Sequence, residues 1–125
     1  MGLDQNAYYC EAARLPCKAQ VDFDMDELEA TSFQYWRKHP DLHGWMEALY
    51  IRKGGKETFN CTPVRLEVED LDQLERSILS RNLPHTTGFF FGSSDGKSSE
   101  EDLEFIRKAR IRLAEGYAVF YNSWW

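Results

Sequence analysis

Alternation of apolar and polar residues predicts two short, half-buried strands, over residues 19–23 and 64–68. The aromatic-rich residues 3–10 form another predicted strand, ahead of both. Residues 87–91 form a short, very apolar segment at two glycines, Gly88 and Gly92, and this pattern also predicts a strand. Residues 117–121 are apolar on both alternations, so this last strand is expected at the centre of the sheet, buried on both sides.

A first helix is predicted after the strand over residues 19–23. Asp24 has the form of a helix cap, and Glu27 three residues later completes the pattern of a capping box. The helix is expected over residues 25–38. Pro40 ends it, because proline cannot donate a backbone hydrogen bond and disfavours helix in the residue before it.

Three further helices follow from apolar residues that recur with the spacing of one helix face. The second spans about residues 40–53 and ends at two glycines. The third begins at Asp70 and ends before Pro84, and the fourth spans about residues 100–115 and ends at Gly116. The inner faces of the second and third helices carry Leu42, Trp45, Met46, Leu49 and Tyr50, and Leu71, Leu74 and Ile78.

These elements predict an α+β fold. They fit one small domain over residues 1–125, with a mixed, mostly antiparallel sheet of about five strands and about four helices packed on it. No internal repeat and no linker interrupts the pattern. Apolar residues make up 42% of the chain, which is enough for a core without disulfides or a structural metal.

The charge balance is acidic, with a formal net charge of −6. An acidic surface repels phosphate backbones and anionic membranes, so we expect neither nucleic-acid binding nor membrane docking. No apolar run reaches the length of a membrane span, and no signal peptide is evident. The three cysteines, Cys10, Cys17 and Cys61, form no C-x-x-C pair. Free thiols suit a reducing cytoplasm, where we expect the protein.

Residues 35–45 are the chemically densest segment, since they hold two tryptophans, two cations and two histidines. Arginine and lysine grip anions and tryptophan offers a stacking face, so the segment could cradle a small anionic or nucleotide-like ligand. A packed corner between two helices explains the same residues without a ligand. The C-terminal tryptophans either pack over the sheet or contribute to a ligand wall or a dimer contact. The candidate ligand-binding residues are Tyr35, Trp36, Arg37, Lys38, His39, His43, Trp45, Trp124 and Trp125.

A metal site is the second hypothesis for this segment. His39 and His43 lie four residues apart, as zinc ligands on a helix do, and Glu47 lies four residues further on. Pro40 is expected to break the helix between the histidines, and Asp41 could be a further ligand. No catalytic residue and no cofactor is assigned from this pattern.

Three other motifs are weaker. Residues 92–98 follow a predicted strand and precede a helix, as a P-loop does, but three residues rather than four separate the glycines. Asp95 would also occupy the place of a phosphate, and the alternating ligands of an EF-hand are missing. Cys61 could pair with a histidine as a nucleophile, although a buried free thiol explains it as well.

As a set, the distinctive segments resemble uncharacterised small proteins of phages and prophages. The resemblance covers nearly the whole chain and implies a gene product made in a bacterial cytoplasm, without an established activity. Such proteins sometimes carry a phosphoglycerate kinase label, for which this chain is far too short. The segments that carry the resemblance are Met1-Gly2-Leu3-Asp4, residues 35–45, Phe59-Asn60-Cys61, Pro63-Val64-Arg65-Leu66, residues 83–92 and Ser123-Trp124-Trp125.

Three functions are consistent with the sequence. The first is a non-catalytic binding protein that interferes with a host process, such as an immune pathway, by sequestering the anionic ligand or by blocking a host protein. The second is a metal-dependent hydrolase that uses His39, His43 and Glu47. The third is a structural or assembly protein. A self-associating surface with Trp124 and Trp125 would support this function, so a homo-oligomer stays an alternative.

Overall fold

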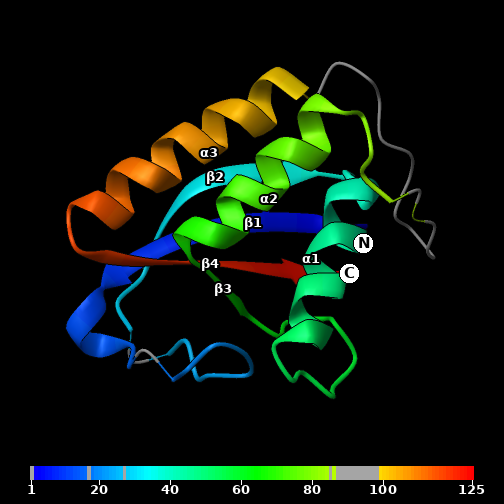
Figure 1. The fold of residues 1–125 in the computed structure, drawn as a ribbon. Coiled ribbons are helices and arrows are strands. Elements are labelled where there is room, and N and C mark those ends of the chain that lie inside the picture. Colours follow the sequence, from blue (N-terminus) through cyan, green and yellow to red (C-terminus); the bar gives the residue numbers. More distant parts are fainter. Residues whose placement is uncertain (1, 17, 27, 85, 87–98) are drawn as a thin grey trace.

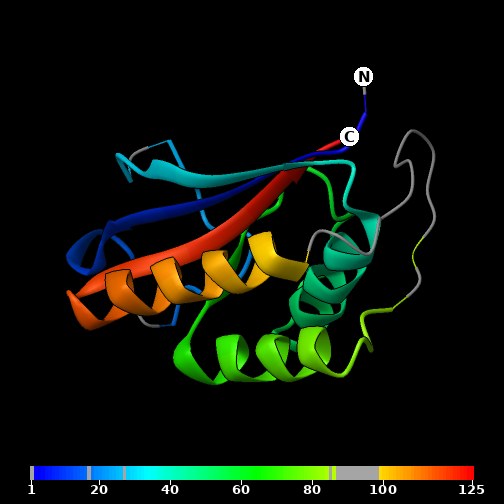
Figure 2. The ribbon, with the colours of Figure 1, turned by 90° about the horizontal axis from the view of Figure 1, so that it is seen from above.

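One antiparallel sheet with helices on one face makes up the fold, as a computed structural model shows for residues 2–16, 18–26, 28–84, 86 and 99–125. The strand order is β2-β1-β4-β3. In Figures 1 and 2 the helices all lie on one side of the sheet. The elements are β1 (Asp4–Glu11), a 3-10 turn η1 (Ala12–Arg14), β2 (Thr31–Arg37), α1 (Pro40–Arg52), β3 (Val64–Leu66), α2 (Val68–Leu79), α3 (Ser99–Ala114) and β4 (Tyr117–Trp124).

The α+β class is confirmed, with a simpler count of elements. The described residues form four strands and three α-helices, where the sequence predicted about five and about four. Every pairing of neighbouring strands in this part of the chain is antiparallel. None of the described helices is both long and apolar enough to cross a membrane.

Strand β4 lies between β1 and β3, as its apolar pattern predicted. Val119 and Tyr121 face the helices, whereas Ala118 and Phe120 face the opposite side. All four side chains are fully buried, because each face of β4 has its own cover. Gly116 precedes the strand with φ +93°, a left-handed conformation that lets helix α3 end and the chain turn back.

The main core fills the space between the sheet and the helices. Amphipathic faces of α1, α2 and α3 supply most of it, and β1, β2, β3 and β4 supply the rest. Phe105 of α3 packs edge-on against Trp36 and stacks on Phe33, which fixes α3 beside β2. The principal members are Ala7, Trp36, Leu42, Trp45, Met46, Leu49, Tyr50, Phe59, Val64, Leu66, Leu71, Leu74, Ile78, Phe105, Ile106, Ala109, Val119 and Tyr121.

A second, smaller core covers part of the opposite face. The connection between β1 and β2 folds back here, so that Leu15 and Leu28 pack with Cys10 and Phe120. Phe23 meets Phe120 edge-on. Among the described residues, this cover does not include the end of the sheet where β1 begins and β4 ends, and there Tyr35 and Trp124 are exposed on what we call the open face.

The predicted helix over residues 25–38 is wrong. Residues 31–37 instead form strand β2, which pairs with β1 along its length, with a bulge at Phe33 of β2 where the register shifts between Ala7 and Tyr8 of β1. The segment is rich in aromatic residues that favour strands, and the partner strand decides the outcome. Asp24 does cap a turn, since its Oδ1 accepts a hydrogen bond from the Asp26 amide at 2.9 Å, but the described residues between it and β2 form no helix.

The predicted strand over residues 19–23 is also wrong. Only Val21 forms a bridge, to Val64, and Asp22 has φ +56°, which interrupts an extended chain. The predicted strand over residues 87–91 lies outside the described residues. Strand β3 ends at Leu66, two residues earlier than predicted.

Helix α2 begins two residues earlier than predicted because Glu67, and not Asp70, is its N-cap. The Glu67 side chain accepts a hydrogen bond from the Asp70 amide, and the Asp70 carboxylate accepts one from the Glu67 amide at 2.9 Å. The same carboxylate lies 2.6 Å from the Lys53 ammonium at the end of α1. Asp70 therefore joins the start of one helix to the end of another.

Replacing Asp70 by alanine should destabilise the fold, because both the cap and the Lys53 contact are lost. We expect the free energy of unfolding to fall by about 1–3 kcal/mol more in Asp70→Ala than in Glu69→Ala. Glu69 is the matched control, since it is an exposed acidic residue in the same helical turn. Urea denaturation followed by circular dichroism measures the difference, and equal losses in the two variants would contradict the bridging role.

Candidate functional site

The predicted ligand-binding residues separate into two groups. Strand alternation separates Trp36 from Tyr35 and Arg37, because neighbouring residues of a strand point to opposite faces, whereas His43 and Trp45 lie on the buried face of α1. Four lie inside the protein, four are exposed, and Trp125 is half-buried. The buried ones are Trp36, His39, His43 and Trp45, and the exposed ones are Tyr35, Arg37, Lys38 and Trp124.

A buried carboxylate organises the interior group. Asp102, in the first turn of α3, is 1% exposed. Its Oδ1 accepts a hydrogen bond from Trp36 Nε1 at 3.0 Å, and its Oδ2 lies 2.8 Å from His39 Nε2. One carboxylate thus holds the end of β2, the residue before α1 and the start of α3 together. Removing either partner would leave a polar group buried without its bond, which costs free energy.

Gln5 extends this network across the sheet. Its Oε1 accepts a hydrogen bond from the His39 amide at 2.8 Å, and its Nε2 donates to the His39 carbonyl at 3.1 Å. The same Nε2 donates to Tyr121 Oη at 3.0 Å, and that hydroxyl lies 2.9 Å from His43 Nδ1. The network therefore links β2, α1 and α3 to the two central strands.

His43 is neutral at physiological pH. It packs against the rings of Phe59, Tyr121 and Trp125, and burial lowers its pKa to about 4. Burial also raises the pKa of the Tyr121 hydroxyl. Because His43 carries no charge and lies inside the core, it offers no cation to an anionic ligand.

The structure does not bring the predicted metal ligands into one cluster. His39 contacts Asp102, His43 contacts Tyr121, and Glu47 is exposed on the outer side of α1. In the described part of the chain, no three His, Cys, Asp or Glu side chains gather as a metal site requires. The P-loop-like residues 92–98 lie outside the described residues, as does Cys17.

The other two cysteines are free thiols in different surroundings. Cys10 is buried in the smaller core, where burial raises the pKa of its thiol. Cys61 is exposed and has φ +60°. No particular histidine was predicted as its partner. His39 and His43 are buried in contact with Asp102 and Tyr121, and His85 lies outside the described residues, so no nucleophile pair follows from these contacts.

The exposed group lies on the open face of the sheet. In the strand register Arg37 of β2 is opposite Asp4 of β1, and Asp4 is opposite Trp124 of β4. The three side chains therefore form one row across three strands. Tyr35 lies one row further along the same face, and its hydroxyl donates to Asp4 Oδ1 at 2.6 Å. We call Asp4, Tyr35, Arg37 and Trp124 the open-face cluster.

The C-terminal residues are held so that Trp124 faces outward. The Asn60 side chain makes two hydrogen bonds to the Trp125 backbone. Its Nδ2 donates to the Trp125 carbonyl at 2.9 Å, and its Oδ1 accepts from the Trp125 amide at 3.0 Å. Trp125 Nε1 donates to the Phe59 carbonyl at 2.7 Å. Trp124 is consequently 67% exposed, and with Trp125, Gly2 and Asp4 it lines a small cavity of about 110 Å³.

Sequence reasoning missed Asp4, Asp102, Gln5 and Asn60. Asp102 stands in a run of acidic residues with Glu100 and Glu101, and only its position in the helical turn distinguishes it from them. Asp4 could have been found from the register of β1, but this register depends on pairing with two distant strands. Neither Asp4 nor Asp102 is part of a local sequence motif.

No protein-family model, curated protein or solved structure matches this chain. The chemistry of the open-face cluster therefore rests on its own geometry.

Changing the central carboxylate to an amide should destabilise the protein strongly. Asp102→Asn keeps the shape but removes the charge that both Trp36 and His39 contact. We expect a loss of about 2–4 kcal/mol in the free energy of unfolding. Glu100→Gln, an exposed change in the same helical turn, should cost less than about 0.5 kcal/mol. Chemical denaturation measures both, and an Asp102→Asn variant as stable as Glu100→Gln would contradict the role of the network.

The neutral state of His43 predicts a dependence of stability on pH. Its pKa is about 4 in the folded protein against an ordinary value of 6.5 for an unfolded chain, so between these values the unfolded chain binds the extra proton. Stability from this group is complete above pH 6.5 and is lost as the pH falls towards 4. Relative to His43→Gln, the wild type should lose about 2–3 kcal/mol over this window. Parallel pH profiles of the two proteins in urea would contradict the assignment.

Proposed function

We propose that this protein is a non-catalytic binding protein that takes up a small, planar, anionic ligand of the nucleotide class on the open-face cluster. The observation that carries the proposal is the row of Arg37, Asp4 and Trp124 across three strands. The row offers a cation, an acceptor and an aromatic face to one ligand.

The spacing of the row suits a ligand with a ring at one end and a phosphate at the other. Arg37 and Trp124 stand two strands apart, which is roughly 10 Å. Trp124 is 67% exposed, so its ring face is available for stacking. The Arg37 guanidinium is exposed as well and can donate two hydrogen bonds to a phosphate, while Lys38 follows it in the chain.

Asp4 gives the row a preference beyond charge. Its carboxylate already accepts a bond from Tyr35 and has further lone pairs for a hydroxyl or amino group of a ligand. A ribose or a base amine carries such donors, whereas a bare inorganic anion does not. The net charge of −6 also disfavours long polyanions, so the expected ligand is small.

The biological role that we propose is interference with a host process. A phage-type protein that binds a nucleotide-like signal could withdraw it from a bacterial immune pathway. Binding without turnover suffices for this role.

Calorimetric titration of the purified protein with AMP, ATP and cyclic di-AMP tests the proposal. We expect at least one to bind, and we expect Arg37→Ala to weaken that binding at least tenfold, since a charge-assisted hydrogen bond is lost. Arg76→Ala, which removes an exposed arginine on α2, should leave binding unchanged.

Native mass spectrometry of protein purified from bacteria complements the titration. A small co-purifying mass that disappears in Arg37→Ala would support the proposal. Full affinity in a folded Arg37→Ala variant would refute it, as would a clean apo mass together with no binding of the three probes. A host protein retained equally by both variants would favour the alternative of a host-protein inhibitor.

A further inference from the structure

The two edges of the sheet are treated differently by the fold. The outer edge of β3 is covered by residues 20–22. Val21 bridges Val64, the Arg65 amide donates to the Gln20 carbonyl at 2.8 Å, and the Asp22 amide donates to the Pro63 carbonyl at 3.3 Å. This cover removes β3 as a template for pairing with another chain.

The outer edge of β2 has no such cover among the described residues. Strand β2 pairs with β1 alone in this part of the chain. The Lys38 amide donates to the Leu3 carbonyl at 2.8 Å, so by alternation Gln34 and Trp36 direct their backbone groups at β1. Tyr35 and Arg37 direct theirs outward. No proline interrupts the strand, and its bulge lies near Gln34.

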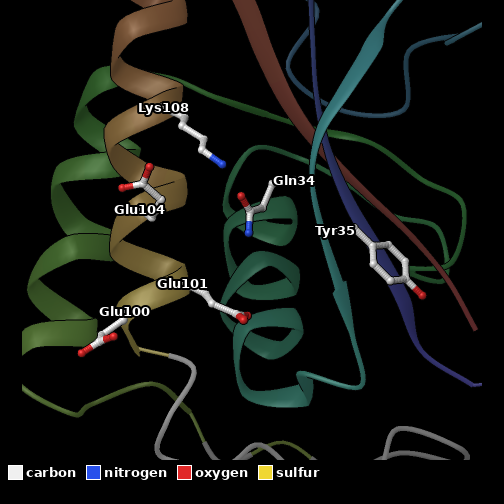
Figure 3. Close-up of a pocket in the computed structure, with 6 residues that line it drawn as sticks. All are labelled: Gln34, Tyr35, Glu100, Glu101, Glu104 and Lys108. Carbon is white, nitrogen blue, oxygen red and sulfur yellow. The ribbon is translucent and has the colours of Figure 1, made fainter.

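Helix α3 runs beside this edge and forms a groove with it. Two adjoining hollows, of about 350 and 300 Å³, lie between β2 and α3. Figure 3 shows Glu101 and Lys108 extending from α3 towards β2, with Gln34 projecting from the strand. The groove is lined by Phe33, Gln34, Tyr35, Glu100, Glu101, Glu104, Lys108, Ile111, Arg112 and Glu115.

The charges along the groove change sign along α3. The first half of the helix brings Glu100, Glu101 and Glu104, and the second half brings Lys108 and Arg112. Glu115, just after the helix, also lines this second half and lies 3.4 Å from the Arg112 guanidinium, so Lys108 supplies most of the positive charge there. Glu100, Glu101 and Lys108 have no ion-pair partner within the described ranges. Beside Lys108 and Arg112, Ile111 lines the same groove and leaves 46% of its surface exposed.

We propose that the β2 edge and the α3 groove bind a second copy of this chain in an antiparallel, two-fold arrangement. The two β2 strands would pair through the outward backbone groups of Tyr35 and Arg37 and continue the sheet. The two α3 helices would run antiparallel, which places the acidic half of one opposite the basic half of the other.

The bipolar groove selects a copy over other partners. A uniformly basic segment would meet Lys108 and Arg112, and a uniformly acidic one would meet the glutamates. A two-fold axis instead reverses the direction of the partner, so that the same surface complements itself. The exposed Ile111 side chains would be covered in the same contact.

This assembly is independent of the ligand proposed above. The side chains of Tyr35 and Arg37 project to the sheet face opposite α3, and Figure 3 shows Tyr35 pointing away from the groove. Pairing at the edge would therefore set two open faces side by side and leave both clusters accessible. Loss of dimerisation need not abolish ligand binding, so the two proposals fail separately.

Analytical ultracentrifugation over a concentration range of about 1 to 200 µM tests the assembly. The wild type should show a concentration-dependent species of twice the 14.7 kDa chain mass. Lys108→Glu should weaken it at least tenfold, because a glutamate then faces the acidic half of the partner and Arg112 is the one basic residue left among the described residues that line the groove. The double variant Glu101→Lys with Lys108→Glu exchanges the charges and should restore the dimer. Lys56→Glu makes the same charge change at an exposed site outside the groove and should have no effect.

The outcomes separate clearly, provided that circular dichroism shows each variant folded. A wild type that stays monomeric at the highest concentration overturns the proposal. So does a dimer that Lys108→Glu leaves intact. A double variant that stays monomeric while Lys56→Glu dimerises overturns the antiparallel arrangement, because exchanged charges should then still match.

Discussion

The buried carboxylate of Asp102 is the contact on which the arrangement of this protein depends. It holds Trp36 and His39, which stand three residues apart on either side of the chain's turn from β2 into α1. This turn contains Lys38 with φ +57°, a strained conformation for a residue other than glycine. It persists because the contacts of Trp36 and His39 on its two sides hold the chain in place. A polar group at this depth specifies one arrangement, because any other leaves its partners without hydrogen bonds.

The exposed surface follows from these interior contacts. Fixing Trp36 inward forces Tyr35 and Arg37 outward, because strand neighbours alternate. The clamp on Trp125 by Asn60 has the same effect on Trp124 at the end of β4. Each of these exposed residues thus neighbours a residue whose side chain is held by a hydrogen bond, Trp36 to Asp102 and Trp125 to Phe59. The open face is therefore held in place without a dedicated scaffold, and ligand binding there would not need to order the chain first.

The sequence predicted those elements whose patterns are local. Helices α1, α2 and α3 and the central strand β4 have apolar residues at spacings that only one structure buries well. Strand β2 was missed because a capping pattern at Asp24 suggested a helix, whereas pairing with β1 decided the structure. The same error concealed which residues form the candidate site. In a strand, unlike in a helix, Trp36 points to the opposite face from its neighbours Tyr35 and Arg37. Asp4 and Asp102 depend on contacts with residues more than 30 positions away, which no local pattern reveals.

The pairing of the first strand with the last has a topological consequence. Asp4 stands opposite Trp124 in the register, and Figures 1 and 2 show the two chain ends lying side by side. The two ends of the described chain are therefore close in space, and a short peptide could join them without disturbing the sheet. New ends could then be opened in a surface connection, as circular permutation requires. Tags or fusion partners attached at either end of this chain would, by contrast, emerge beside the aromatic face of the sheet.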